Sequence, residues 1–350
     1  MIRVRLAHLL QRCRRALGRL LRRSVQTAEP QPSHWSAGVF QQPRAGKFLI
    51  WTVPRRLNYR LYLPRNRTPS GKVPLLVMLH GCNQDAKVFA AGTRMNTLAD
   101  EHECAVLYPE QSAAANGMRC WNWFTREVHS GQGEAALIVG LVQDLLKREA
   151  IDRQRVYVAG MSAGASMAET LALRWPQLFA ACGLHSGAMY AAASSAGEAL
   201  GVMRSGASAS PQKTAEQLAT ESGQATLLVP AIVVHGSADK TVNPCNAVQI
   251  VALHLALAGL QGPGDELPSP TEERRYDFGA HSVLQRDYSL GATLLARSLL
   301  IDGLGHAWSG GDAVHAFNSA SGPDVSRIML EFLLRHSRTG SETLAHLESA

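Results

Sequence analysis

The sequence VYVAGMSAGASMA, at residues 156–168, connects an apolar run to a helical pattern through a turn flanked by glycines. The run VYVA is typical of a strand buried on both faces, and residues 163–174 are typical of a helix. Between them lies GMSAG, residues 160–164, which matches the pattern G-x-S-x-G. In this context the turn pushes the serine hydroxyl out over the sheet edge. We therefore predict Ser162 as a nucleophile. A glycine- and serine-rich turn without chemistry is the alternative.

Apolar runs and helical patterns alternate along most of the chain, which predicts an α/β fold with a mostly parallel central sheet and helices on both faces. Two further runs, FLIWTV at 48–53 and NYRLYL at 58–63, predict an N-terminal antiparallel β-hairpin. The expected buried strands are Leu75–Leu79, Ala105–Tyr108, Val156–Ala159, Phe179–Leu184, Ala231–Val234 and Leu299–Ile301, and the expected helices are Glu134–Arg148, Ala163–Arg174, Asn246–Leu257 and Val325–Arg335.

The basic charge of the chain is concentrated at its front. The 350 residues carry a net charge of +7, but residues 1–28 hold eight arginines and no acidic residue. The remainder has 27 basic side chains against 28 acidic ones, so it offers no clustered positive charge for a nucleic acid. The composition, 46% hydrophobic, predicts one sizeable globular domain. No apolar stretch reaches the roughly 18 residues that a membrane-spanning helix needs.

The composition along the chain predicts three parts. Residues 1–45 form a basic amphipathic segment and a linker, residues 46–337 form the catalytic domain, and residues 338–350 form a polar tail. Leucines at three- and four-residue spacing place apolar and basic faces on opposite sides of a helix near the N-terminus. Such a helix could contact an anionic membrane surface weakly, act as a transit segment, or be a solvated arm. Residues 1–30 contain no clear secretory signal, because arginines interrupt every apolar run.

A serine nucleophile needs a histidine base and an acid that orients it. In a fold with this turn the chain order is serine, then acid, then histidine. Asp239 follows the run AIVV, and His306 follows the run LLI in a loop rich in glycine. We predict these two as the partners of Ser162. Asp302 is the competing acid, and the competing histidines that also follow strands are His80, His185 and His235.

The run LLVML ends in His80-Gly81-Cys82, where this kind of fold supplies a backbone donor for the oxyanion. We predict the N–H groups of Cys82 and Ala163 as the two donors. A plain turn after the strand is the alternative.

Six blocks in order resemble the poly(3-hydroxybutyrate) depolymerase family of esterases, which is related to feruloyl and acetylxylan esterases. The resemblance covers roughly residues 45–336 and implies an α/β-hydrolase fold with Ser162, Asp239 and His306 as the triad. It also implies that Trp121, Trp123 and Trp308 form walls of the substrate groove, although a core position is an equal alternative for each. The blocks are HGCNQD (80–85), YPEQS (108–112), CWNWF (120–124), IDRQRVYVAGMSAGASMA (151–168), HGSADKTVNP (235–244) and GLGHAWSGG (303–311).

The resemblance further implies a disulfide between Cys82 and Cys120, and hence an oxidising compartment. Members of the family are commonly secreted, so the resemblance implies an extracellular location. The lack of a clear secretory signal in residues 1–30 argues against it. The stretch 188–224 is expected to form a helical insertion or lid, with surface disorder as the alternative. Residues 259–271 are expected to form a loop.

These observations predict a serine esterase that hydrolyses poly- or oligo(3-hydroxyalkanoate) esters, short or soluble chains being favoured over crystalline polymer. A feruloyl- or acetylxylan-type esterase is the main alternative, and a non-catalytic binding protein or a peptidase are the others. No cysteine or histidine group has metal-ligand spacing, and no nucleotide-binding glycine motif occurs, so neither metal nor cofactor is expected.

Overall fold

The computed structural model describes residues 34–42, 55–65, 67, 71–222, 228–260, 262 and 266–338. The predicted basic helix, the run at 48–53 and the tail beyond residue 338 lie outside the described residues. Among the helices of the described part, none combines the length and the apolar character needed to cross a bilayer.

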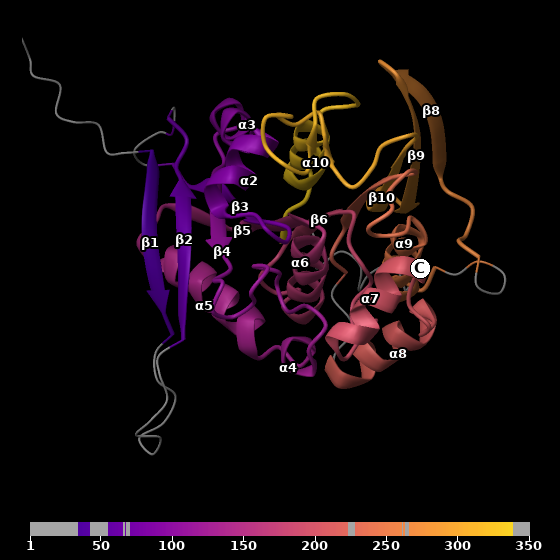
Figure 1. Ribbon diagram of the computed structural model, residues 1–350, viewed down its shortest axis with the longest axis horizontal. Coiled ribbons are helices and arrows are strands. Elements are labelled where there is room, and N and C mark those ends of the chain that lie inside the picture. Colours follow the sequence, from indigo (N-terminus) through magenta and orange to yellow (C-terminus); the bar gives the residue numbers. More distant parts are fainter. Residues whose placement is uncertain are drawn as a thin grey trace, which may run out of the picture. The chain divides into compact units, whose positions relative to one another are not determined.

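Most of the described strands form one large sheet in which the strands of the central part run parallel, as predicted (Figure 1). Antiparallel strands β1 and β2 extend one edge, and antiparallel β9 and β8 extend the other. In spatial order the strands are β1 (Trp35–Gln41), β2 (Arg56–Tyr62), β4 (Ala105–Glu110), β3 (Val73–Leu79), β5 (Ile151–Met161), β6 (Ala181–His185), β7 (Ala231–Gly236), β10 (Thr293–Ile301), β9 (His281–Leu290) and β8 (Glu272–Phe278). The short strands β11 (Trp308–Ser309) and β12 (Asn318–Ser319) pair with each other in a second sheet.

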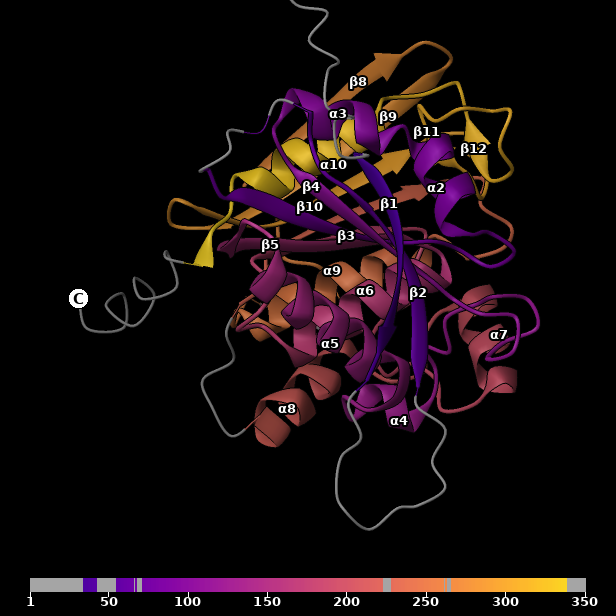
Figure 2. The same cartoon turned by 90° about the vertical axis from the view of Figure 1, so that its left-hand side faces the viewer.

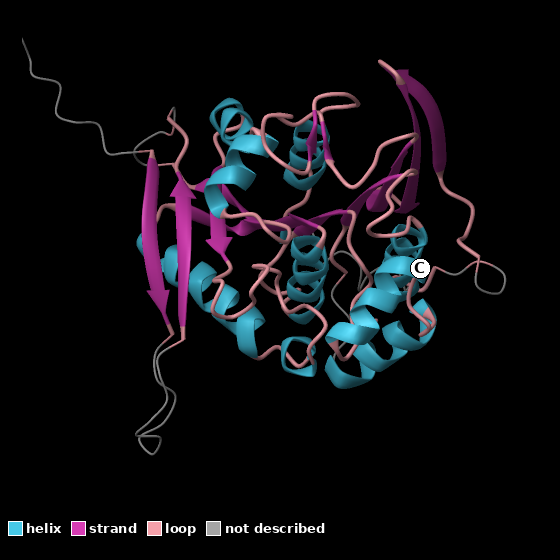
Figure 3. Ribbon diagram, in the orientation of Figure 1, coloured by secondary structure: helices cyan, strands magenta, loops and turns pink. Residues whose placement is uncertain are grey.

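Helices cover both faces of the sheet (Figure 3). Successive side chains of a strand point to opposite faces, so Leu75, Val77 and Leu79 of β3 join one core cluster while Leu76 and Met78 join the other. The first cluster packs against α5 (Gly133–Arg148), α6 (Ala163–Arg174), α7 (Ala196–Ser205), α8 (Pro211–Ser222) and α9 (Cys245–Leu257), and the second packs against α2 (Ala86–Thr93), α3 (Met95–Glu101) and α10 (Val325–Leu334).

One predicted boundary is wrong. Strand β1 lies within residues assigned to the linker, so the domain begins before residue 46. It lies beside β2 and pairs antiparallel with it (Figure 2). The ring of Trp35 packs against Tyr108 at a centroid distance of 5.5 Å. The strand was difficult to predict because most of its side chains are exposed, which leaves no apolar run in the sequence. The antiparallel hairpin of β8 and β9 was missed for the same reason, because the β8 sequence EERRYDF is mostly charged.

The described part of the stretch 188–224 carries two helices, in keeping with the predicted helical insertion. It contains α7 and α8, and α7 begins at the N-cap Ser195, whose hydroxyl accepts a hydrogen bond from the Glu198 N–H. Figure 2 shows α7 beside the carboxyl ends of the parallel strands, where ligands bind in open α/β sheets.

Candidate active site

Ser162 sits at the sharp turn between β5 and α6. Its backbone has φ 56° and ψ −124°, a conformation that costs free energy for a residue with a side chain. Its N–H donates to the carbonyl of His185 at 2.9 Å, which anchors the turn to the neighbouring strand β6. The flanking glycines are required by space, because a Cβ on Gly160 would lie 2.8 Å from the Leu79 carbonyl oxygen and one on Gly164 would lie 2.6 Å from the His80 carbonyl oxygen.

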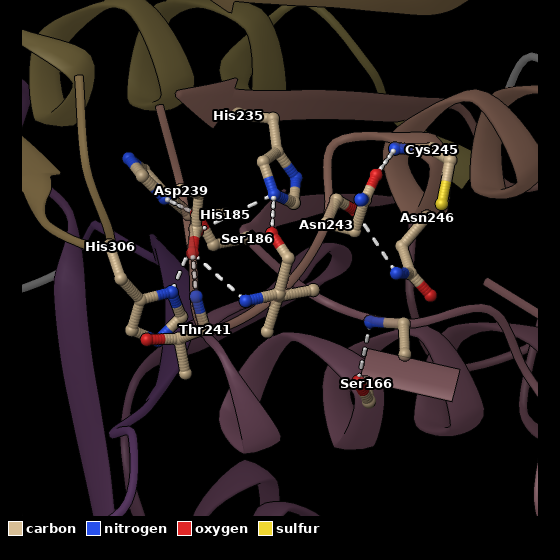
Figure 4. A network of polar contacts seen from close by, with 12 residues as sticks. Ser166, His185, Ser186, His235, Asp239, Thr241, Asn243, Cys245, Asn246 and His306 are labelled. Atoms are coloured by element: carbon tan, nitrogen blue, oxygen red, sulfur yellow. Dashed lines mark hydrogen bonds and ion pairs between the residues drawn. The ribbon is translucent and has the colours of Figure 1, made fainter. Parts of the chain in front are cut away.

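Asp239 and His306 come together from two different loops, after β7 and β10. The Nδ1 of His306 lies 2.7 Å from Asp239 Oδ2, and Oδ1 of the same carboxylate accepts the N–H groups of Thr241 and Val242, each at 2.9 Å (Figure 4). Burial raises the pKa of Asp239, but hydrogen bonds from His235 and His306 outweigh it and hold that pKa well below its ordinary value. The carboxylate therefore stays ionised and fixes the ring of His306 through Nδ1, which leaves Nε2 for a reacting group.

The two loops are joined to each other by backbone contacts. The Ala238 N–H donates to the Leu304 carbonyl at 3.0 Å, and Gly236 allows this approach because a Cβ there would lie 2.7 Å from the Leu304 carbonyl carbon. The competing acid Asp302 accepts the hydroxyl of Ser237 at 2.7 Å. Its side chain thus holds the loops together, and Asp239 is the acid that contacts His306.

The three competing histidines are all buried, and each ring is hydrogen-bonded by its surroundings. His80 Nδ1 donates to the Gly81 carbonyl at 2.7 Å while its Nε2 accepts the Gln111 N–H at 3.1 Å. The ring of His185 stacks on Trp308 at a centroid distance of 5.0 Å. His235 Nε2 lies 2.8 Å from the Val242 carbonyl and 3.5 Å from Asp239 Oδ2, so this ring supports the acid from behind.

These buried rings predict a loss of stability in mild acid. Burial lowers the pKa of His80 to about 4 and that of His185 to about 3, whereas an unfolded histidine titrates near 6.5. The unfolded chain therefore binds more protons below pH 6.5, and stability falls as the pH decreases from there towards the folded pKa values. We expect the free energy of unfolding to fall by about 2 kcal/mol for each of these two histidines between pH 7 and pH 5, measured by urea unfolding at both pH values.

The variant His80→Gln serves as the matched comparison for this pH dependence. It removes one of the buried rings whose pKa is lowered, and it is expected to reduce the loss of stability between pH 7 and pH 5 by about 2 kcal/mol. An unfolding free energy that stays constant between pH 7 and 5 in the unsubstituted protein would contradict the prediction.

The loop after β3 packs directly against the turn that holds Ser162. A Cβ on Gly81 would lie 3.6 Å from Ser162 Cβ, so the next residue, Cys82, is beside the serine. In the described part of the chain no hydrogen bond is donated by the N–H of Cys82 or of Ala163. A disulfide joins Cys82 to Cys120, and the Asn83 N–H donates to the Met118 carbonyl at 2.7 Å. These links tie the loop to the segment that carries Cys120.

A cavity of about 310 Å³ opens beside Ser162. Helix α7 forms one wall with Leu200 and Met203, and Trp123 and Phe124 contribute aromatic surface. The described residues that line the cavity include no charged side chain. His306 is not among them, and no hydrogen bond between it and the Ser162 hydroxyl occurs among the described residues. Bonds between a nucleophile and its base are often long without substrate.

Comparison with known proteins identifies the family. The sequence profile of the esterase PHB depolymerase family matches residues 57–266, which is more than half of the chain. The chain belongs to this family.

Curated relatives of this family member include a poly(3-hydroxyalkanoate) depolymerase C from Paucimonas lemoignei, 32% identical over 68% of this chain and 56% of that protein. Acetylxylan esterase A from Emericella nidulans is 28% identical over 55% of this chain and 64% of that protein. The chain thus spans between about half and two thirds of the length of these two relatives. The structure of an acetyl xylan esterase from Aspergillus awamori shares the fold, with a TM-score of 0.59 and 18% identity over 77% of this chain and 94% of that one.

The prediction that three tryptophans form walls of the substrate groove needs correction for two of them. Trp123 lines the cavity beside Ser162, but Trp121 and Trp308 do not. Trp308 is fully buried, its ring packs edge-on against Phe89 at 5.7 Å, and its Nε1 donates to the Ser326 hydroxyl at 2.9 Å. Trp121 is also fully buried. Both are core residues. The prediction failed for them because the sequence motif does not reveal to which side of the loop each ring turns.

Sequence reasoning missed several cavity residues. Ser166 follows Ser162 by one helical turn, so the spacing alone could have found it. Met118, Leu200 and Met203 carry no motif, and only the folded chain brings them to the serine. Within the described residues, no group of histidine, cysteine or acidic side chains has an arrangement that could hold a metal ion.

Proposed function

We propose that the protein is a serine hydrolase of carboxylic esters. The observation that carries the proposal is the 2.7 Å contact between His306 Nδ1 and the ionised Asp239, together with a strained Ser162 at an uncharged cavity. Ser162 is the nucleophile, His306 the general base and Asp239 the acid that orients the ring. The N–H groups of Cys82 and Ala163 are the oxyanion donors.

In the first half-reaction the Ser162 oxygen attacks the ester carbonyl carbon while its proton passes to His306 Nε2. The carbonyl oxygen takes up the negative charge, which the two N–H groups stabilise. When the bond to the alcohol oxygen breaks, His306 returns the proton to that oxygen and the alcohol leaves. Water then attacks the acyl-enzyme by the same route, and the products are a carboxylic acid and free Ser162.

The substrate we propose is an ester of a 3-hydroxyalkanoate, in oligomeric or polymeric form. The uncharged cavity supports it, because a neutral aliphatic acyl group loses little on entering an apolar space. The poly(3-hydroxyalkanoate) depolymerase among the relatives supports the same class. The disulfide between Cys82 and Cys120 is in keeping with an oxidising compartment outside the cytoplasm.

A second candidate is a feruloyl or acetyl ester of a plant polysaccharide. The aromatic side chains of Trp123 and Phe124 in the cavity wall favour it, since they offer flat apolar surface to an aromatic acyl group. The acetylxylan esterase among the relatives supports this candidate as well.

A product-release assay separates the two. Purified protein and its Ser162→Ala variant are incubated with 3-hydroxybutyrate oligomers and polymer, and with feruloylated and acetylated xylan. We expect 3-hydroxybutyrate as the main product, and none with the variant. Release of ferulate or acetate alone would favour the second candidate. If no product is released from any of these esters, the proposed activity is refuted.

A further inference from the structure

Ser166 is a second serine at the cavity that the proposed mechanism does not use. It lies one helical turn after Ser162 on α6, and its N–H donates to the Ser162 carbonyl at 3.1 Å. Its side chain lines the same cavity as Ser162, and the residue is 2% exposed. An acyl group attached to Ser162 would therefore extend past a hydroxyl that water reaches poorly.

The hydrogen bonds of Ser166 leave its proton without a partner. Its Oγ accepts the N–H of Ala188 at 2.8 Å, which fixes the position of the oxygen (Figure 4). Among the hydrogen bonds of the described residues, none has the Ser166 hydroxyl as donor. A hydroxyl has one donor and two acceptor positions, so the donor is still available.

Apart from Ser166 and the nucleophile Ser162, the polar side chains at the cavity are Ser186 and Asn116, and both contact protein groups. The Ser186 hydroxyl lies 3.1 Å from His185 Nδ1. Asn116 donates to Asn122 at 2.9 Å through its amide nitrogen, and its oxygen accepts the Met118 N–H at 3.0 Å. Because the remaining surface is mostly apolar, a hydroxyl proton there gains more from an acceptor than it would in water.

We propose that the Ser166 hydroxyl donates a hydrogen bond to an oxygen on C3 of the acyl group and so selects 3-hydroxyacyl esters over unsubstituted acyl esters. This inference rests on the proposed esterase function and deepens it. C3 is the second carbon atom beyond the carbonyl carbon. When the acyl group is attached to Ser162, the oxygen on C3 is about one helical turn away from Ser162, which is also the separation of Ser166 from Ser162 along α6. In an oligomer the same position carries the ester oxygen of the adjoining unit, which is also an acceptor.

The test compares methyl (R)-3-hydroxybutyrate with methyl butyrate, which differ only by the C3 hydroxyl. For each enzyme variant the ratio of the two kcat/KM values is measured. Partial unfolding or a less reactive nucleophile lowers both values equally and therefore does not change the ratio. The unsubstituted protein is expected to prefer the hydroxy ester, and Ser166→Ala is expected to lower the ratio about fivefold, the size of one neutral hydrogen bond. Ser166→Thr keeps the hydroxyl and should keep the ratio.

Ser186→Ala is the matched control, because it removes a hydroxyl from the same cavity that is engaged with His185. It should keep the ratio. An unchanged ratio in Ser166→Ala, equal losses in both alanine variants, or no preference in the unsubstituted protein would each overturn the proposal. If Ser166→Ala hydrolyses neither ester, Ser166→Cys takes its place with the same expected loss. Failure of the unsubstituted protein on both esters would instead refute the esterase function itself.

Discussion

Replacing Asp239 with asparagine is expected to lower kcat by about 10⁴-fold while leaving the fold intact. The asparagine oxygen can still accept the N–H groups of Thr241 and Val242, which now bind Oδ1. The amide nitrogen would then face His306 Nδ1 and donate to it. This forces the proton of the neutral ring onto Nε2, where it blocks acceptance of the Ser162 proton. The measurement is steady-state kinetics on a soluble ester, with circular dichroism as the check on folding.

Asp302→Asn is the matched control for this prediction. Asp302 also follows a strand of the sheet and is close to His306 in sequence, but its carboxylate binds the Ser237 hydroxyl. An asparagine oxygen can accept the same hydrogen bond, so we expect kcat to change by no more than a few-fold. If Asp302→Asn abolished turnover and Asp239→Asn did not, the assignment of the acid would be wrong.

Replacing Gly164 with alanine is expected to destabilise the protein by about 3 kcal/mol, the upper end of the usual cost of overpacking. The added Cβ would collide with the carbonyl oxygens of Leu79 and His80. These are backbone atoms at the end of the buried strand β3, so relief requires α6 to move away from the sheet. The result would be visible as a lower midpoint of thermal unfolding, or as loss of soluble protein.

Gly201→Ala tests whether any alanine for glycine has this effect. Gly201 lies inside α7 and a Cβ there would meet no atom within 4 Å. Alanine also favours the helix by about 0.5–1 kcal/mol relative to glycine, so the midpoint should stay the same or rise. A Gly164→Ala protein as stable as Gly201→Ala would show that the turn tolerates a side chain, against the geometry.

The local sequence determined the buried central strands, their main helices and the turn that holds Ser162, but not the strands β1, β8 and β9 towards the edges of the sheet. Buried strands such as β3 and β7 are continuous apolar runs, and α6 begins where the pattern predicted, at Ala163. These features depend on residues close together in the chain, because a strand buried on both faces must be apolar throughout. The sharp turn needs glycine on both sides of the serine for reasons of space that the pattern G-x-S-x-G already contains.

The sequence also proposed a catalytic pair from chain order alone, and the structure places Asp239 and His306 2.7 Å apart. Their role in catalysis stays a prediction. The order of the strands decided this contact, since β7 and β10 are neighbours in the sheet although residues 237–292 separate them in the chain. For the same reason the sequence could only rank Asp302 and the other histidines as competitors. In the folded protein His306 Nδ1 contacts Asp239, whereas Asp302 binds the Ser237 hydroxyl.

Only the tertiary structure decided what lines the cavity. Trp121 shares the motif CWNWF with Trp123, yet only Trp123 lines the cavity, while Trp121 and Trp308 pack in the core. The free hydroxyl proton of Ser166 is likewise invisible in the sequence, because it depends on the Ala188 N–H that occupies the oxygen from another loop. Local sequence sets backbone conformation through sterics and burial pattern, but the direction of a side chain and its partners depend on packing between segments that are distant in the chain.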